Sequence, residues 1–366
     1  GMIGSAIGAA QPVATGEPRA QNMAVGGGAG VVGQGLANAV GMALAERMMN
    51  ARYGDPLVDH YTYVIAGDGC LMEGISHEAI SMAGHLGLSK LIVLFDDNGI
   101  SIDGSTDMAV SDDQLARFAA SNWHVQAVDG QDMDAAAAAI EAAQKSDKPS
   151  MIACKTTIGF GAPTKAGTAS THGAPLGPGE IAGARKALGW DAAPFEVPTD
   201  VLEAWRAAAT KSNDDYEDWQ VRLADSPLKA EFIRTSNGVL PAGVNDAVIA
   251  HKKRVSEEKP KWATRAASGE ALKVLTPVIP ELISGSADLT GSNNTVTPDT
   301  DSLTPTHFGG RYIHYGVREH GMAAAMNGIA LHQGLIPLSG TFLVFADYMR
   351  GAMRLSALMG KRVMYV

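Results

Sequence analysis

Apolar and polar positions alternate in blocks that predict a parallel α/β fold. Residues 61–66 form an apolar, β-rich run that ends in Gly-Asp-Gly, residues 73–88 have a helical pattern, and residues 91–95 form a second, wholly apolar run. A strand, a helix and another strand make a βαβ unit. Continuous apolar strands of this kind are typical of a parallel sheet that is buried on both faces.

The same alternation continues to the end of the chain. Asp132 or Asp134 can cap a helix that runs to about Gln144, and residues 150–154 form a third apolar run. Residues 199–262 are instead polar and charged with short helical runs, which is typical of a linker that wraps a surface. Beyond them the pattern predicts helices at 264–275, 319–331 and 345–359 and strands at 282–285, 312–315, 336–339 and 362–366.

These blocks predict two parallel-sheet domains with helices on both faces. We expect a first domain at residues 1–198, a linker at 199–262 and a second domain at 263–366. A parallel sheet that ends on a strand, with no helix after it, leaves apolar surface and an edge exposed. We therefore expect the second domain to be incomplete and the chain to be a fragment or a split subunit.

Composition narrows the class of protein. The 366 residues are 46% apolar and 19% charged, with 42 glycines, which fits a compact α/β enzyme rich in tight turns. The net charge of -10 and the lack of a long basic block argue against a nucleic-acid partner, so an anionic substrate would need local basic residues. Cys70 and Cys154 form no CxxC pair, and we interpret them as buried small residues in a reducing cytosol.

No stretch of the sequence has the pattern of a membrane span or a signal peptide. Residues 20–45 carry no charge, but they contain Gln, Asn and a run of glycines, and they have few large apolar residues. They predict a loop followed by a buried helix of small residues. Residues 1–7 lack the basic start of a secretion signal, so we expect a cytoplasmic protein without membrane contact.

Two strand ends carry the side chains that point to chemistry. Asp68 lies between Gly67 and Gly69 after the first strand, and Asn98 follows the second strand after 28 intervening residues. The carboxyl ends of adjacent parallel strands meet at one edge of a sheet, where α/β proteins bind ligands. A carboxylate, an amide oxygen and the backbone carbonyl of Ile100 are hard ligands that suit Mg²⁺ or Ca²⁺ on a diphosphate. The glycines would let phosphate oxygens approach the backbone.

Two ordinary turns would produce a similar pattern. Gly-Asp-Gly alone favours that alternative, whereas the asparagine at this spacing favours a site.

Four longer stretches resemble the transketolase family: residues 67–78 (GDGCLMEGISHE), 96–104 (DDNGISIDG), 170–177 (STHGAPLG) and 315–322 (YGVREHGM). The resemblance covers nearly all of the chain apart from its first 30 residues. It implies a thiamine-diphosphate-binding fold and a transferase that uses thiamine diphosphate and Mg²⁺ or Ca²⁺.

The resemblance implies roles for individual residues. Glu319 matches the catalytic glutamate that holds a proton at the aminopyrimidine ring, and a carboxyl group in an apolar pocket suits that role, although a helix start also favours an acidic residue. His172 matches a histidine that binds phosphate or moves a proton near the substrate. The family's cofactor-binding positions fall on Gly30, Val32, Gly67, Asp68, Gly69, Asn98, Ile100, His172, Asp288, Glu319, Phe342, Phe345 and Tyr348.

Several of these matches have an ordinary structural alternative. Phe342, Phe345 and Tyr348 match an aromatic pocket around the aminopyrimidine, but their spacing of three would also suit a buried helix face. Arg265 and Ser292 match a pair that grips the sugar phosphate, since a guanidinium fork suits a phosphate dianion. The alternative for this pair is a solvated arginine at a helix start and a plain loop serine.

The resemblance also implies a homodimer with its active site at the interface. One chain's first domain would hold the diphosphate, and the partner's second domain would supply the glutamate. Glu73 and Glu78 match acidic residues that link the two cofactors, with a solvated helix face as the alternative. The sequence departs from the family's pattern at several places. No segment with the family's early substrate-binding histidines is recognisable before Gly30, Val31-Val32 replaces the usual Pro-Leu, and Ala169 stands where a histidine is common.

The activity implied is reversible transfer of a two-carbon ketol unit between phosphosugars. Xylulose 5-phosphate is the expected donor, and ribose 5-phosphate or erythrose 4-phosphate the expected acceptor, in the pentose phosphate pathway. Two alternatives stay open. One is another thiamine-diphosphate enzyme, such as a dihydroxyacetone synthase or a deoxyxylulose-phosphate synthase. The other is an inactive split subunit or degenerate paralogue.

Overall fold

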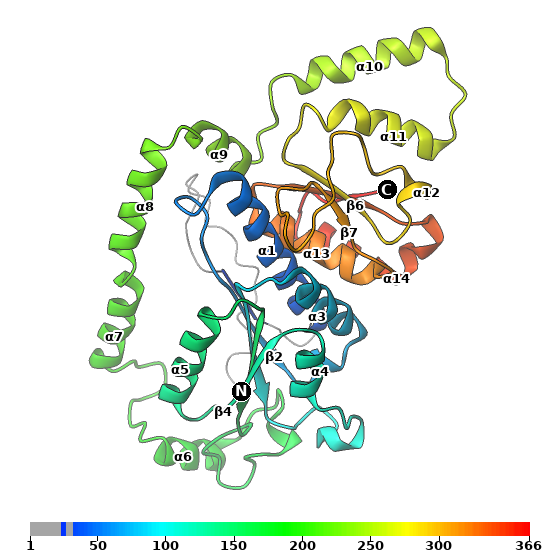
Figure 1. Cartoon of the computed structure of the whole chain (residues 1–366). Helices are drawn as coiled ribbons and strands as arrows, with labels where there is room; N and C mark the ends of the chain where they lie inside the picture. Colours follow the sequence, from blue (N-terminus) through cyan, green and yellow to red (C-terminus); the bar gives the residue numbers. More distant parts are fainter. Residues whose placement is uncertain (1–22, 27–31) are drawn as a thin grey trace.

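The first half of the molecule is built on a parallel sheet. A computed structural model describes residues 23–26 and 32–366 of the chain, and in them this sheet has the strand order β1-β2-β3-β5-β4 (Figure 1). The strands are β1 (Met23–Gly26), β2 (Thr62–Gly67), β3 (Leu91–Asp97), β4 (His124–Asp129) and β5 (Ser150–Lys155). The helices and 3₁₀ turns are α1 (Val32–Tyr53), α2 (Asp68–Met72), α3 (Gly74–Leu86), η1 (Thr106–Met108), α4 (Gln114–Ala120), α5 (Met133–Gln144), η2 (Ala169–Thr171) and α6 (Pro178–Ala187).

Alternate residues of β3 are buried on opposite faces of this sheet. Leu91 and Val93 belong to the core that contains α1 and α3, whereas Ile92 packs with Ala139 and Ala143 of α5. Side chains of a strand alternate between its two faces, so a run without polar positions requires helices on both. The predicted βαβ unit and its doubly covered parallel sheet are confirmed.

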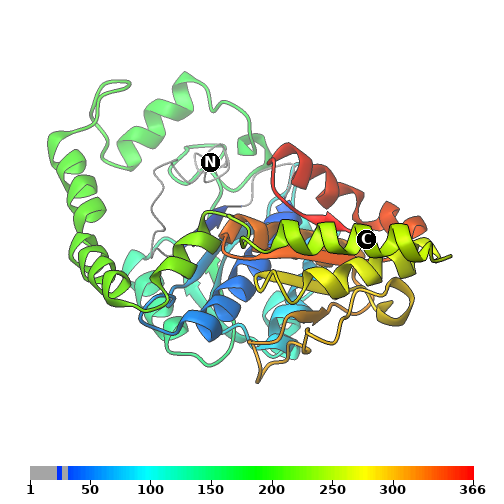
Figure 2. The same ribbon diagram turned by 90° about the horizontal axis from the view of Figure 1, so that it is seen from above.

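Four helices connect the two halves where a linker was expected. They are α7 (Thr199–Thr210), α8 (Asn213–Asp225), α9 (Lys229–Ser236) and α10 (Val244–Glu258). Figures 1 and 2 show α7 and α8 following one side of the molecule and α10 lying beside the first helix of the second half. The buried indole of Trp219 on α8 donates to the carbonyl of Leu57, 3.0 Å away. The segment therefore consists of ordered helices, of which α8 packs on the first half and α10 on the second.

The second half is built on a shorter parallel sheet with the order β7-β6-β8-β9. Its strands are β6 (Leu282–Ser286), β7 (Tyr312–His314), β8 (Ile336–Gly340) and β9 (Met364–Tyr365). Its helices and 3₁₀ turn are α11 (Thr264–Leu275), α12 (Thr290–Asn293), α13 (Glu319–His332), η3 (Leu343–Phe345) and α14 (Ala346–Leu358). The last strand, β9, lies at the edge of the sheet, where the sequence predicted a strand with no helix after it.

A close crossing of α1 and α13 joins the two halves (Figure 1). A Cβ atom on Gly41 would lie 2.0 Å from the carbonyl oxygen of Ala325, and one on Gly328 would lie 2.0 Å from that of Asn38. Only glycine fits at both positions, because the two backbones touch there. This contact explains the small residues around Gly41 in the uncharged part of α1, which ends at Ala45.

Candidate functional site

The predicted acid and amide lie together at the carboxyl edge of the first sheet. Strands β2 and β3 pair with Gly67 opposite Asp96, so the chain leaves both strands at the same level. The Asp68 carboxylate accepts a hydrogen bond from the backbone N–H of Gly99 at 3.1 Å. Two residues that are 30 positions apart therefore share one half-buried turn cluster, as the sequence predicted.

Negative charge is concentrated around Asp68. Burial raises the pKa of the Asp68 carboxyl, and the charges of Asp97 and Asp96 raise it further, while the hydrogen bond from Gly99 lowers it. Crowded carboxylates of this kind favour a cation between or beside them. Across residues 23–26 and 32–366, no group of three or more His, Cys, Asp and Glu side chains is arranged to hold a metal ion.

The glycines on either side of Asp68 leave space open. Neither Gly67 nor Gly69 has a positive φ, and in the described part of the chain no atom beyond their immediate neighbours and the backbone of their own helix lies within 4 Å of the position that a Cβ would take. Backbone conformation and internal packing therefore do not require glycine at these positions. The residues fit a bulky anionic group held against the backbone beside a cation on Asp68.

His172 lies on the loop that follows β5, directly after η2, and is half-buried. Gly30 lies outside the described residues, and Val32 is described only as the first residue of α1. Ile100, whose backbone carbonyl was predicted as a cation ligand, donates its backbone N–H to Asn98 Oδ1 at 2.9 Å. On the first half, residues 67–69 thus lie at the junction of β2 and α2, Asn98 and Ile100 follow β3, and His172 follows η2 on the long loop after β5.

The predicted residues of the second half follow the carboxyl ends of its strands. Asp288 follows β6, Glu319 follows β7 and Phe342 follows β8. Asp288 is exposed and has a φ of 60°, a left-handed conformation that is uncommon outside glycine. Because these strands are parallel, the three residues lie on one edge of the second sheet.

Glu319 is buried at the first position of α13 and has a second carboxylate beside it. Glu78 of α3 accepts a hydrogen bond from the backbone N–H of Gly321 at 2.7 Å. Burial raises the pKa of Glu78, and the nearby charge of Glu319 adds to this effect. Burial likewise lowers the pKa of the neighbouring His320, whose Nε2 has no hydrogen-bond partner in the described part of the chain.

The three aromatic residues form an exposed row rather than a buried helix face. The ring centroids of Phe342 and Phe345 are 5.7 Å apart, and those of Phe345 and Tyr348 are 5.9 Å apart. Phe342 is 41% exposed and Tyr348 is 67% exposed. The helical spacing alone had favoured a core position, so periodicity was misleading here.

Arg265 and Ser292 lie on neighbouring elements. Arg265 is exposed in the first turn of α11, and Ser292 is half-buried in α12. The two helices are close, because a Cβ on Gly269, one turn beyond Arg265, would lie 2.8 Å from the Cβ of Asn294. No hydrogen bond or ion pair between described residues joins this edge to the turn cluster of Asp68. The chain therefore holds two sets of predicted site residues on two separate edges.

The fold and these edges define a class of protein. It is a parallel α/β protein with two sheets, whose carboxyl edges carry a carboxylate and amide cluster on one side and an acidic residue with aromatic rings on the other. The family description "Transketolase, thiamine diphosphate binding domain" matches residues 9–241, and "Transketolase, pyrimidine binding domain" matches residues 260–366. The chain belongs to the transketolase family.

Characterised relatives and solved structures agree with this assignment. A transketolase from Cereibacter sphaeroides is 60% identical over 337 residues, which are 92% of this chain and 51% of the relative. The structure of a transketolase from Leishmania mexicana matches with a TM-score of 0.84 and 42% identity, covering 92% of this chain and 51% of that one. A transketolase from Pichia stipitis in complex with sedoheptulose 7-phosphate matches with a TM-score of 0.84 and 40% identity, covering 91% and 51%. The chain spans about half the length of these relatives.

Proposed function

We propose that the chain is part of a transketolase. The activity is reversible transfer of a two-carbon ketol unit from a ketose phosphate such as xylulose 5-phosphate to ribose 5-phosphate or erythrose 4-phosphate, in the pentose phosphate pathway. The meeting of Asp68 with the turn of Asn98 and Gly99 carries the proposal, because it forms the cation end of a diphosphate site. The family membership and the phosphosugar complex of the Pichia stipitis relative support it.

The residues of the first edge would hold the polar end of the cofactor. Asp68, Asn98 and the carbonyl of Ile100 would bind Mg²⁺ or Ca²⁺, and the open space beside Gly67 and Gly69 would receive the diphosphate. When bound, thiamine diphosphate supplies the electron sink that allows a carbon–carbon bond of the sugar to break. His172 would donate a hydrogen bond to phosphate or to the sugar.

The residues of the second edge would orient the ring and the substrate. Glu319, buried at the start of α13, would hold a proton at a ring nitrogen of the aminopyrimidine. The aromatic row would pack against that ring, with Asp288 close to the cofactor. Arg265 and Ser292 would bind the phosphate of the sugar, for which a guanidinium fork is suited.

A homodimer would bring the two sets together. The exposed aromatic row on one chain needs a surface to cover it, and the first edge of a second copy is the surface that would complete the site.

We propose domain boundaries for this half-length chain at 1–198, 199–262 and 263–366. The described helices include none long and apolar enough to cross a bilayer. We propose a cytoplasmic protein without membrane or nucleic-acid partners.

Calorimetry on the 366-residue chain tests the cofactor proposal. Thiamine diphosphate titrated in the presence of Mg²⁺ should give saturable binding that chelation of the metal abolishes. An assay with xylulose 5-phosphate and ribose 5-phosphate then tests transfer, in the chain alone and after the remaining half of a relative is added. If the cofactor binds but only a non-phosphorylated acceptor is turned over, the result would favour another thiamine-diphosphate enzyme, such as a dihydroxyacetone synthase. Absence of binding would overturn the proposal for this chain.

A further inference from the structure

The side-chain amide of Asn98 is held at both of its ends. Its Nδ2 donates to Oδ2 of Asp96 at 3.3 Å, and its Oδ1 accepts from the backbone N–H of Ile100 at 2.9 Å. Rotating the amide by half a turn would set Oδ1 against a carboxylate oxygen and Nδ2 against an N–H. Both contacts would then be repulsive, so this pair of partners fixes which end of the amide is the oxygen.

Asp96 is itself fixed from the neighbouring strand. The hydroxyl of Thr156, just beyond β5, donates to Oδ1 of Asp96, while Oδ2 receives Asn98. Strands β3 and β5 are paired in parallel, with Asp96 opposite Cys154, so Thr156 stands beside Asp96 at the edge of the sheet. A chain of two hydrogen bonds therefore runs from Thr156 through Asp96 to Asn98.

We propose that Asp96 and Thr156 are positioning residues that select the oxygen end of Asn98 as a cation ligand. The inference rests on the proposed cation site. An amide binds a hard cation through its oxygen only, so a carboxylate that holds the NH₂ group removes the unproductive orientation. The role needs no contact with the cation, because it is exerted through the hydrogen bonds that the two oxygens of Asp96 accept from Thr156 and Asn98.

The adjacent Asp97 provides a control within the same turn. Its carboxylate pairs with Lys155 at 3.3 Å, on the partly exposed side of the strand. Both Asp96 and Asp97 raise the pKa of Asp68 by their charge, with Asp97 the stronger of the two. If charge alone mattered, removal of Asp97 would weaken cation binding at least as much as removal of Asp96. If positioning matters, removal of Asp96 has the larger effect.

A cofactor-free experiment tests the orientation of the amide directly. The chain labelled with [¹⁵N]asparagine gives side-chain NH₂ signals, and N98D identifies the signal of Asn98 by its loss. Bonding to a carboxylate should shift one proton of this group downfield and slow its exchange. D96A and T156V should remove or reduce both signatures, whereas D97A should leave them unchanged. Signals that do not respond to D96A would overturn the inference, even if the cation site itself is real.

Calorimetry with thiamine diphosphate and Mg²⁺ tests the consequence for binding. D96A should weaken the apparent cation affinity by about 10- to 100-fold, in the range of other residues that orient metal ligands. T156V, which keeps the charge, should give a smaller loss, and D97A a loss of less than about threefold. If D96A and D97A lose equal cation affinity, the effect of Asp96 is one of charge and the proposed positioning role is overturned. No binding by the wild-type chain would overturn the proposed cation site instead, and the labelled-asparagine result would still stand.

A double substitution separates orientation from charge. In the N98D chain both ends of the side chain are oxygens, so nothing remains to be oriented, and Asp96 can contribute only its charge. D96A should therefore cause no more than the small loss expected of D97A when it is made in N98D, although it causes a much larger loss in the wild type. The same loss in both backgrounds would show that Asp96 acts without Asn98. Far-UV circular dichroism and thermal midpoints of each variant separate these effects from unfolding.

Discussion

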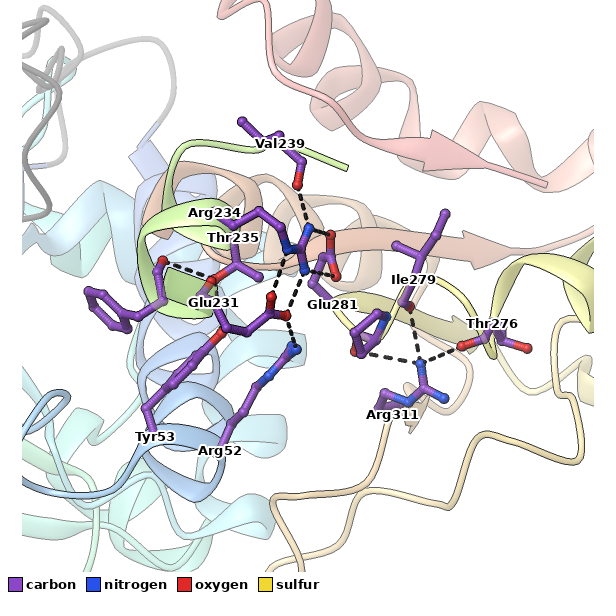
Figure 3. Close-up of polar contacts among 12 residues, drawn as sticks. Arg52, Tyr53, Glu231, Arg234, Thr235, Val239, Thr276, Ile279, Glu281 and Arg311 are labelled. Atoms are coloured by element: carbon purple, nitrogen blue, oxygen red, sulfur yellow. Dashed lines mark hydrogen bonds and ion pairs between the residues drawn. The ribbon is translucent and has the colours of Figure 1, made fainter. Parts of the chain in front are cut away.

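The amino ends and the carboxyl ends of the strands differ in how completely the chain satisfies them. At the amino ends, Glu281 precedes β6 and is 2% exposed, and Arg234 of α9 holds it with two hydrogen bonds of 2.8 and 2.9 Å (Figure 3). At the carboxyl ends, aromatic rings are exposed and glycines face open space. The amino ends are closed by buried polar contacts, whereas the carboxyl ends combine local hydrogen bonds, such as the one from Gly99 to Asp68, with exposed aromatic rings and open space beside glycines.

Other residues reinforce the closure of the amino ends. Arg311, just before β7, donates to the carbonyls of Thr276 and Ile279 (Figure 3). His60, before β2, lies with its Nε2 3.0 Å from that of His332, which precedes β8, and the rings are stacked. The Arg311 contacts lie within the second half, and the histidine contact joins the two halves. Substitutions at the amino ends should therefore cost stability, and those at the carboxyl ends should cost binding.

The largest effect is expected from D68A. Loss of the only carboxylate in the predicted ligand set should weaken binding of Mg²⁺ with thiamine diphosphate by more than about 100-fold. Stability without cofactor should stay the same or rise, because burial and the charges of neighbouring acids raise the pKa of Asp68 and so oppose its charged form. Calorimetry and thermal unfolding measure the two effects. A large loss of stability with retained cofactor binding would contradict the view that the carboxyl ends of the strands serve binding and the amino ends serve stability.

Substitution R234M should be the most damaging change at the amino ends. It would leave the Glu281 carboxylate buried without its partner and should lower the free energy of unfolding by about 3–5 kcal/mol. R350M is the control, because Arg350 and Asp347 form a pair in which both side chains are largely exposed, and it should change stability by less than about 1 kcal/mol. Denaturant unfolding compares the two. Equal effects would show that the Arg234 network contributes no more than a surface pair.

Substitution Y348S should weaken self-association with little effect on the folded chain. Tyr348 is 67% exposed, so its loss costs little burial within one chain, and the dimer dissociation constant should rise about tenfold. M349A is the matched control on the same helix, because Met349 is 3% exposed and its truncation should cost about 2–5 kcal/mol of stability. Sedimentation equilibrium measures the dimer dissociation constant. An unchanged dissociation constant would remove the aromatic row from the interface.

The smallest effect is expected from pH at the histidine pair. Burial, together with the nearby His332 and Lys90, lowers the pKa of His60 to about 3. The unfolded chain binds a proton at His60 below about pH 6.5, whereas the folded chain does not until about pH 3, so acidification through this window favours unfolding. H60N should reduce the fall of the thermal midpoint between pH 7 and pH 5 by a few degrees. If the thermal midpoints of the wild type and H60N depend on pH in the same way, the lowered pKa of His60 would be contradicted.

Regular elements with a consistent pattern were predicted well from the sequence. The helix at 264–275 and the strands at 91–95 and 150–154 lie where the apolar pattern placed them, within one or two residues. Strand β4 was not predicted, because it is an edge strand with mixed burial and has no continuous apolar run. Helical runs were predicted within the linker, but the bounds of most of its helices were not, because few side chains are buried there: α8 buries Trp219 and Leu223, and α10 buries Val244.

The site was predictable where it depends on strand ends and not where it depends on tertiary contacts. Asp68 and Asn98 follow adjacent strands of one βαβ unit, so local pattern was enough to bring them together. Asp96 received no role, because its partner Thr156 is 60 residues away and follows a strand, β5, whose place in the sheet the sequence does not reveal. Adjacent acidic residues next to a predicted ligand were the available signal.

The glycine contact between α1 and α13 has a mechanical consequence. At Gly41 and Gly328 backbone rests on backbone, so no side chain separates the two helices at these positions. Because α13 begins at Glu319, this crossing fixes where that carboxylate lies relative to the first half. We therefore expect the spacing of the two halves to stay constant, and any rearrangement on ligand binding to occur in the loops at the carboxyl ends of the strands.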